Sequence, residues 1–261
     1  MHIQRVISVC LVSLFVAAGC AVKPAATSSA AADKAAIAAA IANPNRLAAD
    51  VARDAGRKPQ QILEFAGARP GMSVLDLFAG GGYYTELLSY VAGPSGRVVA
   101  YNNTGYARVA SKDIEAHFAN GRLASVEQLT SDNNETKLPA ASFDLVMMIL
   151  SYHDVYYLDG ERGWNRIDRP KLLKEVFNSV KPGGKVVVID HVATAGMPAE
   201  QVKALHRIDP ALIKADFTAA GFALDGESDV LRNPNDNFGL IAMAPPVRGK
   251  TDRAVLRFVK P

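Results

Sequence analysis

Short apolar runs and segments of helical spacing alternate along most of this chain. Apolar runs bounded by turn residues predict buried strands, and they cover Ser73–Leu77, Arg97–Tyr101, about Ala124–Leu129, Phe143–Leu150, Lys185–Asp190, about Phe222–Leu231 and Ala254–Val259. Segments with apolar residues at helical spacing lie between them, at Tyr83–Ala92, about Val109–Ala119, Pro170–Val180 and Pro210–Ala220. Such alternation indicates an α/β fold, in which a mostly parallel, doubly wound sheet carries helices on both faces.

The N-terminus has the pattern of an export signal. Residues 1–19 contain a basic start and an apolar run from Val6 to Ala18 that is too short to span a bilayer. The segment Val16–Cys20 resembles a bacterial lipobox, whose cysteine is lipidated after cleavage. We therefore expect a signal peptide over residues 1–19 and a lipid anchor at Cys20, with plain secretion or an uncleaved anchor as alternatives. If the lipobox is real, Ala21 resembles outer-membrane sorting, which places the protein in the periplasm.

A tether is predicted between this signal and the main domain. Residues 20–44 are rich in alanine and serine, a composition that suits a flexible linker. A helix over Ala35–Ala42 is compatible with alanine's propensity but has little to bury. One domain with an N-terminal helical extension, which includes a helical stretch from Asn45 to about Arg57, is expected over residues 45–261.

Charge and cysteine content narrow the function classes. The net charge is +3, and no basic stripe is interleaved with aromatic residues, so a nucleic-acid partner is not expected. Cys10 lies inside the predicted signal, which leaves Cys20 as the cysteine of the mature chain and allows no disulfide within one molecule.

A glycine-rich turn joins the first predicted strand to the helix that follows it. Asp76 ends the apolar run, Ala79–Gly82 forms the turn and Tyr83 begins the helix. Glycine lets the backbone approach a ligand closely, and the free amides at a helix start favour an anionic group. Phe78 replaces the first glycine of a dinucleotide fingerprint, which disfavours a nicotinamide dinucleotide.

With the strands that follow it, the run Val74–Thr85 resembles motif I of the class I S-adenosylmethionine (SAM)-dependent methyltransferases. The resemblance implies SAM as cofactor and a Rossmann-like sheet of seven strands with an antiparallel last strand. It also implies that ligands sit beyond the carboxyl ends of the strands. The residues that it implies for SAM are Asp76, Ala79, Gly80, Gly81, Gly82, Tyr83, Asn102, Asp132 and Asn133.

Each polar residue in this set could have a structural role instead of binding SAM. The acid at Asp76 faces the methionine part of the cofactor in the family, but it could instead cap the next turn. Asn102 stands where the family usually has an acid for the ribose hydroxyls, and its amide offers one acceptor and one donor group. Its surroundings also suit a turn. Asp132 and Asn133 occupy the segment that flanks adenine in the family, although Asp132 could simply start a turn.

A polar and aromatic cluster follows the fourth predicted strand, in the family's region beside the transferring methyl group. His153 can act as a general base because the pKa of histidine lies near neutral, and Tyr152 and Asp154 are further catalytic candidates. Because neighbouring residues of a strand point to opposite faces, no direct dyad of His153 and Asp154 is expected. The alternative is that His153 packs in the core and the tyrosines form a lid.

Two later histidines, His191 and His206, could border the substrate side. No histidine pair has ligand spacing on one element, so no metal site is predicted. A serine hydrolase is excluded because the chain has no G-x-S-x-G elbow.

The resemblance extends over residues 46–261 to an exported, lipoprotein-like group of predicted bacterial methyltransferases. It is carried by Arg53–Pro59, the motif I loop, Tyr152–Asp154, Leu173–Gly184, His206–Asp209 and Val247–Arg253. It implies methyl transfer from SAM to a small-molecule or envelope acceptor. SAM is made in the cytoplasm, however, so a non-catalytic, surface-tethered binding module on the same fold is the alternative.

Overall fold

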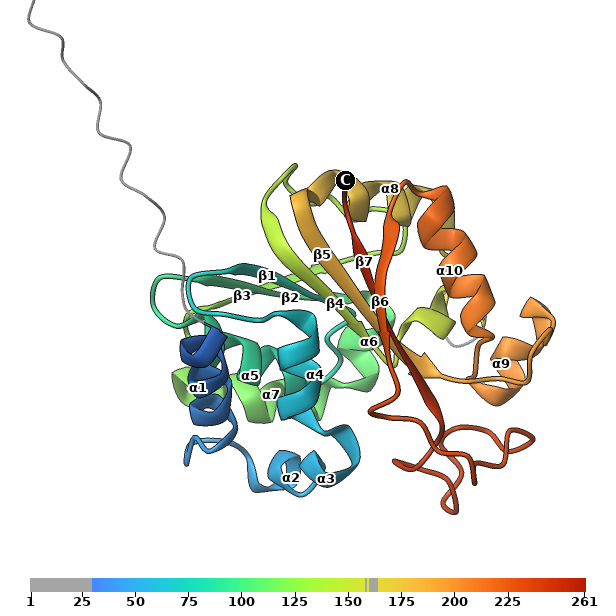
Figure 1. The fold of residues 1–261 in the computed structure, drawn as a ribbon, viewed down its shortest axis with the longest axis horizontal. Coiled ribbons are helices and arrows are strands. Elements are labelled where there is room, and N and C mark those ends of the chain that lie inside the picture. Colours follow the sequence, from blue (N-terminus) through green and yellow to red (C-terminus); the bar gives the residue numbers. More distant parts are fainter. Residues whose placement is uncertain (1–29, 158, 160–163) are drawn as a thin grey trace, which may run out of the picture.

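A seven-stranded sheet with the strand order β3-β2-β1-β4-β5-β7-β6 forms the centre of the computed structural model, which describes residues 30–157, 159 and 164–261 (Figure 1). β1 to β5 pair in parallel, and β7 is antiparallel to both β5 and β6. This confirms the predicted mostly parallel α/β fold with an antiparallel last strand. The strands are β1 (Ser73–Leu77), β2 (Arg97–Asn103), β3 (Val126–Ser131), β4 (Phe143–Ile149), β5 (Val180–His191), β6 (Ala223–Ser228) and β7 (Arg253–Val259).

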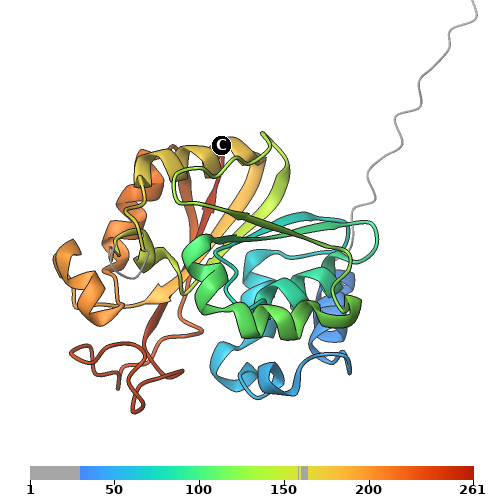
Figure 2. The same cartoon turned by 180° about the vertical axis from the view of Figure 1, so that it is seen from behind.

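Helices cover both faces of the sheet (Figures 1 and 2). Ile37, Leu63 and Leu87 of α1, α4 and α5 pack on one face, while Leu173 of α8 and Phe217 of α10 belong to the core on the other face. The helices are α1 (Ala30–Ile41), α2 (Ala48–Val51), α3 (Asp54–Arg57), α4 (Pro59–Ala66), α5 (Tyr83–Ala92), α6 (Thr104–Val109), α7 (Ser111–Phe118), α8 (Arg169–Ser179), α9 (Val202–Leu205) and α10 (Pro210–Ala219).

Helix α1 corrects the predicted tether. It occupies the second half of residues 20–44 and packs against α4 and α5. Ile37 and Ala40 are only 1% and 3% exposed. The alanines of α1 present little apolar surface, but small side chains also let a helix approach its neighbour closely, so one isoleucine suffices to anchor it. The predicted signal peptide and Cys20 lie outside the described residues.

One predicted helix is divided, and another is confirmed as α7 with a short helix before it. The helical stretch expected from Asn45 to about Arg57 consists of the short helices α2 and α3, and the helix expected over Val109–Ala119 is preceded by α6. None of the helices within residues 30–157, 159 and 164–261 is long and apolar enough to cross a membrane.

The chain turns sharply where β1 and β4 end side by side. Phe78 and Leu150 follow these two strands with φ of 58° and 57°, in the left-handed region that non-glycine residues rarely adopt. Such a conformation costs about 1–3 kcal/mol and persists only where its surroundings enforce it. The ring of Phe78 stacks on Tyr106 with centroids 5.3 Å apart. Both turns lie at the point of the sheet where ligands of doubly wound folds bind.

Candidate active site

The glycine loop after β1 borders a cavity of about 180 Å³. Gly80 and Gly82 have φ of 59° and 112°, which glycine adopts readily and other residues do not. A Cβ at Gly81 would lie 2.4 Å from the Cβ of Asp113 on α7. The loop is therefore packed against α7 as bare backbone. The cavity lining includes the predicted residues Asp76, Ala79, Gly80, Gly81, Gly82 and Tyr83.

Asp76 is a buried carboxylate at the edge of this cavity. It is 2% exposed, and its Oδ2 accepts a hydrogen bond from Thr85 Oγ1 at 2.6 Å. Burial raises the pKa of Asp76 to about 6, against the smaller opposing effects of the Thr85 hydrogen bond and the charge of Arg57. Among the described residues no lysine or arginine forms an ion pair with Asp76. A ligand that brings a positive group would therefore find a favourable partner here.

The N-terminal extension forms another wall of the same cavity. Arg53 and Arg57 line it, and Arg57 lies over the ring of Tyr83, with its Cζ 4.5 Å from the centroid. Asp54 holds this wall in place, because it accepts a hydrogen bond from Tyr83 Oη at 2.6 Å and pairs with Arg46 at 2.7 Å. The Arg53–Pro59 motif was visible in the sequence, but nothing there indicated that it would fold back over the glycine loop.

Asn102 has a different partner from the one expected. Its Oδ1 accepts a hydrogen bond from the amide of Gly80 at 2.9 Å, and its Nδ2 donates to the carbonyl of Gly80 at 3.0 Å. One acceptor site and one N–H of the amide thus hold the loop, and the second acceptor site and the second N–H are not used by these two bonds. An aspartate could accept the first hydrogen bond but would repel the carbonyl, which explains an asparagine at this position. Asn102, with Ala79 and Gly82, also lines a second cavity of about 270 Å³ beside the loop.

Asp132 and Asn133 do not line either cavity around the glycine loop. Asp132 is exposed, and its carbonyl accepts the amide of Glu135 at 3.1 Å, as the turn alternative predicts. The side chain of Asn133 bonds Asn103 at 2.7 Å and the carbonyl of Asn165 at 2.6 Å. β3 begins and ends about two residues later than expected, so that Asp132 and Asn133 directly follow its last residue, Ser131.

The residues after β4 form a short 3-10 turn, η2 (Tyr152–Val155), instead of continuing the strand. Side chains of such a turn do not alternate between two faces. His153 Nε2 therefore lies 3.4 Å from Asp154 Oδ1, contrary to the prediction that these residues would point apart. Tyr152 is a further correction, because its fully buried ring packs against Phe217 and its hydroxyl donates to Asp216 Oδ2 at 2.7 Å.

His153 is fixed by Asp190 at the end of β5. The Nδ1 of His153 lies 2.8 Å from Asp190 Oδ1, and its backbone amide donates to Asp190 Oδ2 at 2.7 Å. Burial alone would lower the pKa of His153, but the charges of Asp190 and Asp154 raise it to about 9. An imidazole that is protonated at neutral pH does not accept a further proton. The two neighbouring carboxylates therefore favour a His153 that supplies positive charge.

A third cavity, of about 280 Å³, opens beside His153. Leu150 and Tyr106 line both this cavity and the one at Asp76, so the two spaces adjoin. The hydroxyl of Tyr106 donates a short hydrogen bond to Asp154 Oδ2. The remaining lining residues are Val109, Asp154, Tyr157, Trp164, His191, His206 and Met243. Sequence reasoning missed Tyr106, which stands outside every recognisable motif. It placed Asp190 at the end of the fifth predicted strand, where it could border the substrate side, but did not foresee its contact with His153.

The sheet order, the glycine loop after β1 and the adjoining cavities after β4 define a class I SAM-dependent methyltransferase. The chain belongs to the ubiE/COQ5 methyltransferase family, whose model matches residues 54–204. Membership in this family shows SAM as the cofactor and gives no support to a non-catalytic binding module.

Curated relatives match about half of the chain. The ubiquinone/menaquinone biosynthesis C-methyltransferase UbiE of Shewanella woodyi is 27% identical over 129 residues, which are 49% of this chain and 46% of that protein. The protein of the same name from Hydrogenovibrio crunogenus is 28% identical over 132 residues, or 50% and 46% of the two chains. The match thus spans less than half the length of these relatives.

Solved structures share the fold. A SAM-dependent methyltransferase from Aquifex aeolicus has a TM-score of 0.53 at 22% identity, covering 77% of this chain and 89% of that one. One from Mesorhizobium loti has a TM-score of 0.55 at 16% identity, covering 80% and 100%. Phosphoethanolamine N-methyltransferase 2 of Haemonchus contortus, in complex with SAM, has a TM-score of 0.54 at 16% identity, covering 78% and 52%.

Proposed function

We propose that this protein transfers the methyl group of SAM to a small aromatic acceptor that carries an ionisable hydroxyl group. The observation that carries this proposal is the common wall of the two cavities. Tyr106 and Leu150 border both the space at Asp76 and the space at His153. A methyl group that leaves the first space therefore has a short path into the second.

Residues on the first side fit the charges of the cofactor. Asp76 suits a positively charged group, Arg57 suits a carboxylate, and the loop Gly80–Gly82 leaves its backbone exposed to the cavity. When bound, SAM supplies a methyl group that is already activated as a sulfonium. The chain then has to align the acceptor and stabilise its nucleophilic form.

Residues on the second side fit an aromatic acceptor. Tyr106 and Trp164 lie edge to face with centroids 5.2 Å apart, and Tyr157 and Trp164 are related in the same way at 5.8 Å. Aromatic walls of this kind favour a planar ligand. His153 presents Nε2 next to this space, where a positive charge would stabilise a hydroxylate. The names of the curated relatives, which refer to ubiquinone and menaquinone, agree with a ring-containing acceptor.

The place of the reaction follows from the predicted export signal. A lipid anchor at Cys20 would put the acceptor cavity in the cell envelope, so we propose an envelope acceptor. The test uses two reactions, in which purified chain and labelled SAM are added together either to an envelope extract or to a cytosolic extract of the producing cells. Label in a small, solvent-extractable envelope compound supports the proposal. The proposal is overturned if calorimetry detects no SAM binding, or if SAM binds but neither extract yields a labelled product. Label in the cytosolic extract alone overturns the envelope assignment.

SAM affinity should depend on pH through Asp76. Burial holds the pKa of this carboxyl at about 6, above its ordinary value of 3.8, and a bound cation favours its charged form. Binding below pH 6 must therefore release a proton, so affinity falls as pH falls, by about tenfold between pH 7 and pH 5. Calorimetry at several pH values measures this slope. Asp76→Asn should bind more weakly with no such slope, and an unchanged slope in that variant would contradict the assignment.

Replacing Asn102 by aspartate separates the two roles considered for this residue. A ribose ligand would gain from two acceptor oxygens, so affinity for SAM would rise. A residue that holds Gly80 would instead set a carboxylate against the carbonyl that now accepts its hydrogen bond. We expect the second result, with SAM bound about 5–100-fold more weakly, which corresponds to a lost buried hydrogen bond. Tighter binding by Asn102→Asp would restore the ribose role.

A further inference from the structure

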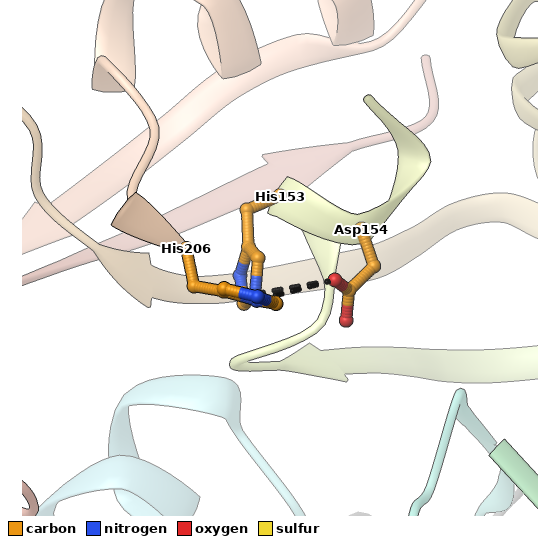
Figure 3. A group of neighbouring side chains, drawn as sticks. All are labelled: His153, Asp154 and His206. Carbon is orange, nitrogen blue, oxygen red and sulfur yellow. Dashed lines mark hydrogen bonds and ion pairs between the residues drawn. The ribbon is translucent and has the colours of Figure 1, made fainter. Parts of the chain in front are cut away.

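Three potential metal ligands converge at the border of the acceptor cavity. His153 and Asp154 come from η2, and His206 follows α9 (Figure 3). The Nε2 of His153 lies 3.3 Å from Nδ1 of His206 and 3.4 Å from Oδ1 of Asp154. The remaining side of this triangle, between His206 Nδ1 and Asp154 Oδ1, measures 3.7 Å. Two imidazole nitrogens and one carboxylate oxygen thus face a common centre.

The triangle has the size of a transition-metal site. Ligands bound at Zn–N distances of 2.0–2.1 Å in a tetrahedron stand about 3.3–3.4 Å from one another. The measured separations of 3.3, 3.4 and 3.7 Å need only a small contraction to reach this arrangement. We propose that His153, Asp154 and His206 bind a divalent transition-metal ion, best fitted by Zn²⁺, with a further coordination position open to the acceptor cavity.

The atoms that do not face this centre are held by other partners. The Nδ1 of His153 is bonded to Asp190, which leaves Nε2 to bind the ion once it has released its proton. Oδ2 of Asp154 accepts the Tyr106 hydroxyl, which leaves Oδ1. Metal-binding histidines commonly have such a carboxylate behind them, because it fixes the ring and increases its basicity.

Backbone contacts place His206 beside η2, far from it in the sequence. The amide of Ile208 donates to the carbonyl of His191, and the amide of Ala193 donates to the carbonyl of Ile208, at 2.9 and 3.0 Å. These bonds fix the segment that carries His206 against the end of β5. Since the ligands come from two separate elements, no spacing in the sequence could reveal the site.

A second group of acidic and histidine side chains does not have these properties. Asp50, Glu86 and His117 are all buried. Arg53 pairs with Asp50 at 2.9 Å, and Arg122 pairs with Glu86 at 2.6 Å. With two arginines in place the acidic charge is already compensated, so we assign this group to the attachment of α2 to α5 and α7.

An ion at this position would act on the acceptor hydroxyl. A metal with an open coordination position polarises an oxygen bound to it and lowers the pKa of a hydroxyl group. It would therefore supply the positive charge beside the acceptor hydroxyl that His153 otherwise provides. This use rests on the proposed function, whereas the binding of the ion does not.

Titration of the full chain with ZnCl₂ tests the site directly, with Co²⁺ as a spectroscopic probe of tetrahedral coordination. We expect the unchanged chain to bind one ion. In Asp154→Asn and in His206→Gln the affinity for this ion should be at least 100-fold weaker. Asp190→Asn should weaken binding 10–100-fold, as the loss of a supporting partner does. The matched control is His191→Gln, because the Nδ1 of His191 bonds Thr251 Oγ1 at 2.7 Å and is not part of the triangle.

Circular dichroism and SAM calorimetry show whether each variant is folded. Zinc bound elsewhere on the chain would persist in Asp154→Asn and His206→Gln, so the difference from the unchanged chain isolates this site. No binding by the unchanged chain, or equal binding by these two variants, overturns the metal site. Metal binding without SAM binding would instead contradict the proposed function, so the two failures are distinct.

Discussion

Replacing Arg207 by methionine is expected to lower the free energy of unfolding by about 3–5 kcal/mol. Arg207 is fully buried and pairs at 2.6 Å with Asp236, whose side chain is also fully buried. Its guanidinium also donates to three backbone carbonyls, those of Val192, Leu240 and Asn237. Methionine fills much of the volume but leaves the buried carboxylate without its cation, with only the amide of Asp252 still donating to it, and removes the donor of the three carbonyls. Removing one partner is the costly way to break a buried pair.

Urea denaturation followed by circular dichroism measures this loss. Arg97→Met is the matched control, because Arg97 pairs with Glu127 while both side chains are about half exposed, at 43% and 52%. An exposed pair of this kind contributes about 0–1 kcal/mol. Similar small losses in both variants would show that Arg207 is not a structural anchor. A large loss of unfolding free energy in Arg207→Met alone would show that Arg207 anchors the segment that carries the proposed metal ligand His206.

The fold was predictable because its central strands β1, β4 and β5 contain apolar runs and its turns are marked by glycine and proline. β1 has the predicted bounds, Ser73–Leu77, and α5 has the predicted bounds, Tyr83–Ala92. The helix α1 was harder to recognise, because Ile37 is its main large buried side chain and the rest is alanine. Periodicity detects apolar surface, and α1 buries only Ile37 and Ala40.

Local motifs located the glycine loop, whereas the roles of single polar residues depended on contacts that no motif contains. Asn102 was placed at the correct strand end, but its bonds to Gly80 depend on how the loop folds back over β2. The left-handed turn at Leu150 redirects the residues after it, which sends Tyr152 into the core and brings Asp154 to His153. A sequence pattern does not encode such a turn when the residue that adopts it is leucine.

Replacing His153 by alanine is expected to lower the rate of methyl transfer about 10²–10⁴-fold, the usual contribution of a group that acts on the reacting proton or charge. SAM affinity should change by less than about twofold, because His153 lines the acceptor cavity but not the adjoining cavity at Asp76. The rate is measured with labelled SAM and the acceptor fraction of the extract, and calorimetry gives the affinity.

The matched control is Tyr152→Phe, because Tyr152 lies in the same turn and its hydroxyl bonds Asp216 in the core. Equal rates for His153→Ala and the unchanged chain would remove His153 from the mechanism, whether as a source of charge or as a metal ligand. A slow rate in both variants would instead show that the turn as a whole, and not the imidazole, is what the reaction requires.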